Sequence, residues 1–238
     1  MATLLLTRPL ASSQRFAAQL RERLGDVQVV ISPLMRIEPV GTAPDLVGAG
    51  TLIFTSQNAL AAVPDGQGRP CYTVGDATAA AAQAAGFDPI AVEPDAEALF
   101  QRIMADRPAG PLLHLRGHHA RGRLAERLTG AGIATDEKVV YEQRETALSD
   151  EAETLLSGEE PVIVPLFSPR SAKIFVSQYA GDAPLFIAAM SDAVADALGG
   201  LPVQQVARAA APDAAAMIDT IEGLMDAARS LEASGGGK

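Results

Sequence analysis

The stretch from residue 51 to residue 87 constrains the fold most, because two apolar runs there each pass directly into an alanine-rich segment of helical pattern. The first run ends at Thr55 and Ser56, and the second run, residues 71–74, ends at Gly75. Short apolar runs that lead into helices are typical of buried parallel strands. The first turn of such a helix exposes unpaired backbone N–H groups beside small hydroxyl residues, and both favour an anion. The repeating unit is therefore strand, helix, strand, helix, and a binding site is expected at its turns.

The same alternation continues along the rest of the chain. Further strands are expected at residues 3–6, 27–31, 89–92, 111–115, 162–167, 185–190 and 203–207, and helices at 95–105, 120–131, 172–179, 192–198 and 212–231. Another helix is expected before residue 27. Ser12 or Ser13 would cap its N-terminus, and Gly25 would end it. Because each strand alternates with a helix, the sheets should be parallel.

Internal similarity sets the predicted domain plan. Residues 54–56 resemble residues 167–169, and residues 4–8 resemble residues 112–116, but the units occur in a permuted order. We therefore predict an α/β protein of two similar parallel-sheet domains, the first discontinuous. The predicted parts are residues 1–34 with 145–231 as domain 1, 41–138 as an inserted domain 2, 35–40 and 139–144 as linkers, and 232–238 as a flexible tail. Both linkers are extended, and we expect them to pair as a two-stranded hinge beside a cleft.

Composition excludes several classes of function. The 238 residues carry 29 acidic against 19 basic side chains, a net charge of −10 that argues against general binding of nucleic acid or an anionic membrane. The single cysteine, Cys71, lies in an apolar run and is expected to be buried, so no intrachain disulfide can form. The N-terminal stretch, residues 1–8, is too short for the apolar core of a signal peptide, and no run approaches the ~18 residues of a membrane span. We expect a cytoplasmic monomer.

Familiar catalytic motifs are absent. The chain has no Gly-x-Ser-x-Gly, no P-loop and no Gly-x-Gly-x-x-Gly after a strand, which weighs against hydrolases, NTPases and dinucleotide-binding enzymes. The densest positive cluster is His114, Arg116, His118, His119, Arg121 and Arg123. It is either a solvated helix face or part of a basic cleft. A strand and a turn separate its histidines, so they lack helical metal-ligand spacing, and we expect neither a metal nor a cofactor.

The turns after the strands carry hydroxyls, backbone N–H groups and arginines, which suit a ligand with several carboxylates or phosphates. The predicted substrate-binding residues are Arg8, Thr55, Ser56, Gly75, Thr78, Arg116, Gly117, Ser168, Arg170 and Ser191. The alternative is that the serines and threonines only cap helices. Tyr141, in the second linker, is the candidate catalytic acid, because a phenol can donate a hydrogen bond to a departing oxygen without carrying charge. Its alternative role is an aromatic ring that packs over the hinge.

Five short motifs resemble those of the uroporphyrinogen-III synthase family in order and context. They are Phe-Thr-Ser at 54–56, Val-Gly-Asp-Ala-Thr at 74–78, Leu-Arg-Gly at 115–117, Val-Tyr-Glu at 140–142 and Phe-Ser-Pro at 167–169. The resemblance implies a cofactor-free cytosolic enzyme of two α/β domains joined by a two-stranded ladder. It also implies a reaction, in which the linear tetrapyrrole hydroxymethylbilane is cyclised to uroporphyrinogen III with inversion of ring D and loss of water.

The resemblance also implies roles for single residues. Tyr141 would assist departure of the hydroxyl group, and the substrate contacts would include Thr55, Ser56, Thr78 and Ser168. Many members have Gly-Pro-x-Thr where residues 191–194 here read Ser-Asp-Ala-Val, so the hydroxyl at that turn would come from Ser191. The competing hypothesis is a non-catalytic hinged binder of a small polyanion, which would use the same turns but need no acid. A receiver-type regulatory module would need clustered acidic residues at strand ends, and Asp76 and Asp192 form no such cluster in the sequence.

Overall fold

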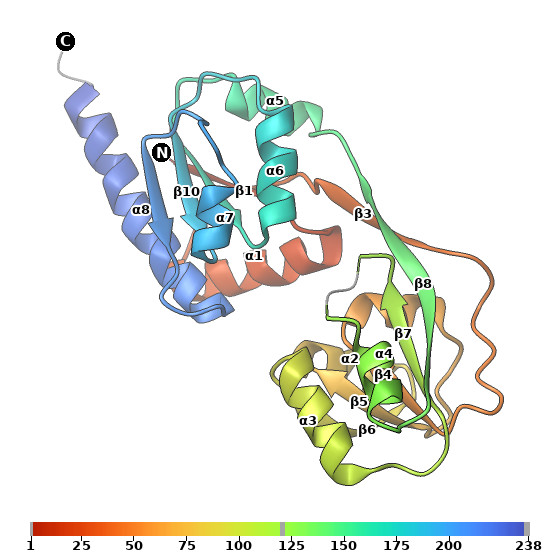
Figure 1. Cartoon of the computed structure of the whole chain (residues 1–238). Helices are drawn as coiled ribbons and strands as arrows, with labels where there is room; N and C mark the ends of the chain where they lie inside the picture. The colour runs from red at the N-terminus through yellow and green to blue at the C-terminus, as the bar shows by residue number, and fades with distance from the viewer. Residues whose placement is uncertain (1, 120–121, 236–238) are drawn as a thin grey trace. The chain divides into compact units, whose positions relative to one another are not determined.

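The structure is a computed structural model that describes residues 2–119 and 122–235. The chain divides into two compact units (Figure 1). Unit 1 comprises Met1–Arg36 and Glu145–Lys238, and unit 2 comprises Ile37–Arg144. Among the described residues, no helix combines the length and apolar character that crossing a bilayer requires.

Unit 1 is a five-stranded sheet in the order β11-β10-β9-β1-β2, and its neighbouring strands all run parallel. The strands are β1 Thr3–Leu6, β2 Val29–Ile31, β9 Val162–Leu166, β10 Leu185–Ala189 and β11 Gln205–Arg208. The helices are α1 Leu10–Leu24, α5 Asp150–Leu156, α6 Pro169–Gln178, α7 Asp192–Asp196 and α8 Ala214–Gly235.

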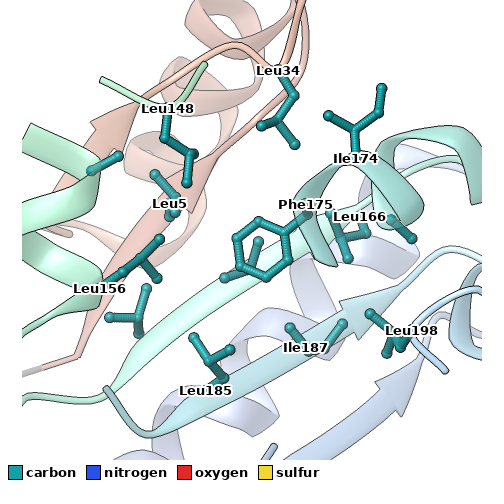
Figure 2. Packing of buried hydrophobic residues seen from close by; sticks show 14 of the residues in the cluster. Leu5, Leu34, Leu148, Leu156, Leu166, Ile174, Phe175, Leu185, Ile187 and Leu198 are labelled. Carbon is teal, nitrogen blue, oxygen red and sulfur yellow. The ribbon is translucent and has the colours of Figure 1, made fainter. Parts of the chain in front are cut away.

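Helices cover both faces of the unit 1 sheet. Leu4 and Leu6 belong to the apolar cluster under α1 and α8, whereas Leu5 belongs to the cluster under α5, α6 and α7. Successive strand residues point to opposite faces, so one strand supplies both cores. Figure 2 shows Phe175 of α6 with Leu5 and other buried residues around its ring. Coverage on both sides explains why these strands read as uninterrupted apolar runs.

Unit 2 is a six-stranded sheet in the order β3-β8-β7-β4-β5-β6. The strands are β3 Met35–Pro39, β4 Thr51–Phe54, β5 Pro70–Val74, β6 Asp88–Glu93, β7 Leu112–Gly117 and β8 Thr135–Glu145. The helices are the 3₁₀-helix η1 Gln57–Ala62 and the α-helices α2 Asp76–Ala84, α3 Ala96–Asp106 and α4 Leu124–Gly130. The pairs β4–β5, β5–β6, β4–β7 and β7–β8 are parallel, and Cys71 is buried on β5, as predicted.

Strands β3 and β8 are hydrogen-bonded neighbours at one edge of the unit 2 sheet. Just beyond β3, the Val40 N–H donates to the Val140 carbonyl at 3.0 Å. The predicted pairing of the two extended segments, residues 35–40 and 139–144, is therefore confirmed.

Two predicted helix starts were wrong. The first helix begins at Leu10 directly after Pro9, and no side-chain cap is formed; Ser13 instead donates its hydroxyl to the Arg8 carbonyl at 2.8 Å. The helix predicted at 120–131 begins only at Leu124, since Arg123 has a left-handed backbone that a right-handed helix cannot include. Residues 120 and 121 lie outside the described residues.

Two further helices differ from the predicted pattern. The alanine-rich segment after Ser56 forms a single short 3₁₀-helix rather than an α-helix. Helix α8 continues to Gly235, so the predicted tail at 232–238 was wrong for its first part. Glu232 and Ala233 are good helix formers, and the glycines that disfavour a helix begin only at residue 235. Residues 236–238 lie outside the described residues.

Candidate functional site

A pocket of about 230 Å³ lies at the carboxyl ends of β4 and β7 in unit 2. Its lining includes four of the predicted site residues, Thr55, Ser56, Gly117 and Tyr141, together with His114. In parallel sheets this edge collects the turns that follow neighbouring strands, which is why residues far apart in the sequence meet here.

A β-bulge aims Tyr141 at this pocket. Along β7 and β8, Arg116 lies opposite Val139, but Gly117 lies opposite Tyr141, so one residue of β8 is skipped. Such bulges bend a strand locally and redirect side chains. The ring then packs so closely over Gly117 that a Cβ there would lie 2.5 Å from the Tyr141 Cζ atom. Only glycine fits at residue 117 without moving the tyrosine.

Thr55 and Ser56 have different local roles. The Ser56 hydroxyl accepts a hydrogen bond from the Asn58 N–H at 3.3 Å and caps η1, so the capping role applies to this serine. The Thr55 Oγ1 lies 3.1 Å from the His114 Nε2 instead. The Thr55 hydroxyl is therefore held by an imidazole at the wall of the pocket.

The sequence placed His114 only in the positive cluster, and its burial at the wall of this pocket was not predicted. His114 lies on β7 with only 3% of its surface exposed, and its Nδ1 has no hydrogen-bond partner among the described residues. Burial lowers the pKa of His114 to about 4, against an opposing effect of Glu137 and with a smaller lowering effect of Arg116. The imidazole is thus neutral near pH 7. One signal in the sequence could have indicated this burial. His114 lies two residues after Leu112 on the same strand, so both side chains point to the same face, and Leu112 is buried.

Gly75 and Thr78 lie at the start of α2 and are not among the pocket residues. Gly75 has φ +77°, which side chains rarely adopt, and its N–H donates to the Glu93 carbonyl at 2.8 Å. Thr78 is 5% exposed within the first turn of α2. At this turn it is Val74 that lines the pocket.

Arg116 is already engaged. Its guanidinium forms an ion pair with Glu137 at 2.5 Å and donates to the Gly117 carbonyl at 3.0 Å. It lines a second hollow of about 600 Å³ beside α4, where Arg123, Asp136 and Glu137 supply charges of both signs. The structure therefore does not bring Arg116 into the pocket of Tyr141. Within residues 2–119 and 122–235, no three His, Cys, Asp or Glu side chains gather as metal ligands would.

The predicted residues of unit 1 also follow its strands. Arg8 comes after β1 and stacks over the Phe167 ring, with its Cζ atom 4.1 Å from the ring centroid. Burial, and to a lesser extent the neighbouring charge of Arg15, lowers the pKa of Arg8. No described carboxylate forms an ion pair with it. A partly desolvated guanidinium without a counter-ion favours binding of an anion.

Three other predicted residues begin helices of unit 1. The Ser168 hydroxyl accepts from the Ser171 N–H at 3.1 Å and caps α6, so it has a capping role. Arg170, in the first turn of α6, lies 3.8 Å from Glu145. Ser191 precedes α7 but its side chain makes no capping bond, which leaves its hydroxyl without that role.

Comparisons with known proteins identify one family. The family model described as uroporphyrinogen-III synthase HemD matches residues 14–219. The chain is similar to the crystal structure of uroporphyrinogen-III synthetase from Helicobacter pylori 26695, with 20% identity and a TM-score of 0.67 over 94% of this chain and 100% of that one. A mutant uroporphyrinogen III synthase from Thermus thermophilus gives 16% identity and a TM-score of 0.47 over 96% of this chain and 100% of that one. No curated protein matches the chain.

At such low identity the Helicobacter likeness shows the fold, a mixed α/β structure with parallel sheets. The family model goes further because it matches most of the sequence. We conclude that this chain belongs to the uroporphyrinogen-III synthase family.

Proposed function

We propose that the chain cyclises hydroxymethylbilane to uroporphyrinogen III, with the unit 2 pocket as the place where the hydroxyl group departs. Membership of the family supports the reaction. One observation carries the site: the pocket gathers Tyr141 with Thr55 and Ser56, a phenol with two aliphatic hydroxyls, around one small volume. We further propose a cytoplasmic monomer that takes a small-molecule substrate and does not bind nucleic acid.

Tyr141 acts as the weak acid in this proposal. The lone pair of the pyrrole nitrogen drives cleavage of the carbon–oxygen bond of the hydroxymethyl group, and the hydroxyl leaves as water after taking up a proton. The pyrrole N–H gives up a proton in return, so the product is a neutral, electrophilic azafulvene and no proton is consumed overall. Because the substrate supplies the driving force, the protein needs only a hydrogen-bond donor at the departing oxygen and a fixed orientation. Gly117 and the bulge in β8 hold the Tyr141 ring at the pocket.

Four of the other predicted residues, Arg8, Thr55, Ser56 and Ser191, bind the acetate and propionate groups of the substrate. In unit 2 Thr55 and Ser56 line the pocket, and in unit 1 Arg8 offers a charge that no described carboxylate has neutralised. Ser191, whose hydroxyl makes no capping bond, is a further donor in unit 1. These contacts orient the flexible chain so that the substituted carbon of ring D meets the electrophile.

A coupled assay tests the proposed function. Hydroxymethylbilane is generated enzymatically in the presence of the purified chain, and the III and I isomers of the product are separated. We expect isomer III. Isomer I alone, which is the product of spontaneous closure, would reject the activity and leave the alternative of a non-catalytic polyanion binder, which direct binding of the tetrapyrrole would then measure.

A further inference from the structure

The contact between His114 and Thr55 joins a buried imidazole to a residue of the unit 2 pocket. His114 is buried, with 3% of the residue's surface exposed. Its Nε2 lies 3.1 Å from the Thr55 hydroxyl, while its Nδ1 is sealed from solvent without a partner among the described residues. A buried polar atom without a partner is costly, and such atoms gather at functional sites.

The surroundings determine which nitrogen carries the proton. If the proton were on Nδ1, an N–H donor would be buried without an acceptor. With the proton on Nε2, the unsatisfied atom is only a lone pair, which proteins tolerate more often than an orphaned N–H. Glu137 lies opposite His114 across β7 and β8, but its carboxylate is already paired with Arg116 and is no acceptor for Nδ1. The Nε2–H tautomer is therefore favoured.

This tautomer sets the direction of the Thr55 hydroxyl. When Nε2–H donates to the Thr55 Oγ1, the threonine can no longer donate its own proton to the imidazole. The hydroxyl proton must then point elsewhere, and we infer that it points into the pocket, because Thr55 lines that pocket together with Tyr141. A hydroxyl that accepts from a fixed donor is a stronger donor in turn, because hydrogen bonds in a chain polarise one another.

We propose that His114 is a positioning residue that acts through Thr55, turning the threonine hydroxyl into the pocket as a donor for a carboxylate of the substrate. The inference rests on the proposed function, since it assumes that a polycarboxylate enters this pocket. It adds a residue outside the motifs of the family resemblance, with a defined direction of donation: imidazole to threonine to carboxylate.

A double-mutant cycle tests this proposal, with KM and kcat measured for isomer III formation. The variants are Thr55→Val, His114→Leu and the double variant, with Thr154→Val on the exposed surface of α5 as a matched threonine control. We expect either single change to raise KM roughly tenfold with little change in kcat, because one hydrogen bond to a charged group is lost. The double variant should then be no worse than Thr55→Val alone, since His114 acts only through that hydroxyl.

His114→Gln supplies the rescue. A glutamine amide places an N–H donor at about the position of the imidazole Nε2, so KM should return to within about threefold of the wild-type value. A purely structural role for the imidazole predicts instead that Gln and Leu lower thermal stability alike and that the losses in the cycle add. Additive losses, or a Gln variant as poor as Leu, would overturn the inference. If His114→Leu does not fold, the comparison of His114→Gln with Thr55→Val decides the matter by the same KM criterion.

The wild-type product keeps this test separate from that of the proposed function. If the unaltered chain makes isomer I only, the proposed function fails before any variant is compared. If it makes isomer III while the cycle is additive, the positioning role of His114 alone is rejected.

Discussion

The two units place polar residues at equivalent ends of parallel strands but use different chemistry there. In unit 1 the turn after β1 carries Arg8, a stacked guanidinium without a carboxylate partner among the described residues. In unit 2 the residue after β4 is Thr55, and its neighbours are a neutral imidazole and a phenol. Arg116, near the end of the neighbouring strand β7, is already paired with Glu137.

The difference suggests a division of labour. A free cation attracts any carboxylate and depends little on its angle of approach, whereas hydroxyls in a small pocket favour one geometry. We therefore interpret unit 1 as the source of net attraction for the substrate and unit 2 as the source of orientation and acid assistance. The following changes test this division, beginning with the largest expected effect.

Replacing Tyr141 with Phe should lower kcat about 100-fold or more while KM changes little, because the donor to the departing oxygen is removed and the ring is kept. The assay of isomer III formation gives both constants, and circular dichroism checks the fold. Unchanged turnover combined with weaker binding would show that the role assigned to this tyrosine is wrong.

The neutral state of His114 should make unit 2 sensitive to acid. Its pKa is about 4 in the fold against an ordinary value of 6.5, so the unfolded chain binds more protons between these values. This contribution to stability is complete above about pH 6.5 and is lost as the pH falls toward about 4. Urea unfolding gives the free energy of unfolding at about pH 7.5 and pH 5. Between these two pH values the wild type should lose roughly 2 kcal/mol more of it than His114→Gln does. Equal losses in the two proteins would place the imidazole in a more solvated setting.

Replacing Arg8 with Gln should raise KM about tenfold and leave kcat nearly unchanged, because a charged hydrogen bond to the substrate is lost while the acid, Tyr141, is kept. The matched control is Arg229→Gln on α8, an exposed arginine paired with Asp226. The difference in KM between the wild type and Arg8→Gln should shrink as salt is added to both assays, because salt screens the attraction between Arg8 and the substrate. A fall in kcat of the same size as that of Tyr141→Phe would contradict the division between the units.

Arg116→Gln should have the smallest effect, a change in KM of less than about threefold, because its charge is already neutralised within the fold. The same kinetic assay is sufficient. A larger rise in KM than that of Arg8→Gln would reverse the assignment and make Arg116 the main contact for the anionic groups of the substrate.

Local patterns in the sequence were enough to predict most strands and their order with helices. Apolar runs such as residues 52–54 and 162–166 are short and uninterrupted, and only a sheet covered on both faces buries every side chain of such a run. The capping role of Ser168 could likewise be predicted, since it depends on the next three residues alone. The starts of α1 and α4 were missed because left-handed or proline-fixed backbones there override the apolar pattern.

Contacts between distant residues explain what could not be predicted at the site. Thr55 and His114 are separated by 59 positions in the chain, and their hydrogen bond exists only because β4 and β7 pair in one register. The place of Tyr141 beside Gly117 depends on a bulge between β7 and β8 that no local pattern announces. Arg116 was predicted to bind substrate, because nothing in the local sequence indicates its ion pair with Glu137, which lies on a different strand.

By itself the sequence determined the alternation of buried strands and helices, and with it the polar turns at the strand ends, since hydrophobic periodicity and capping act over a few residues. Only the tertiary structure decided which of those turns meet in one pocket and which side chains are already paired. Strand order, register and bulges decide these contacts, and they depend on packing between segments that the local sequence does not specify.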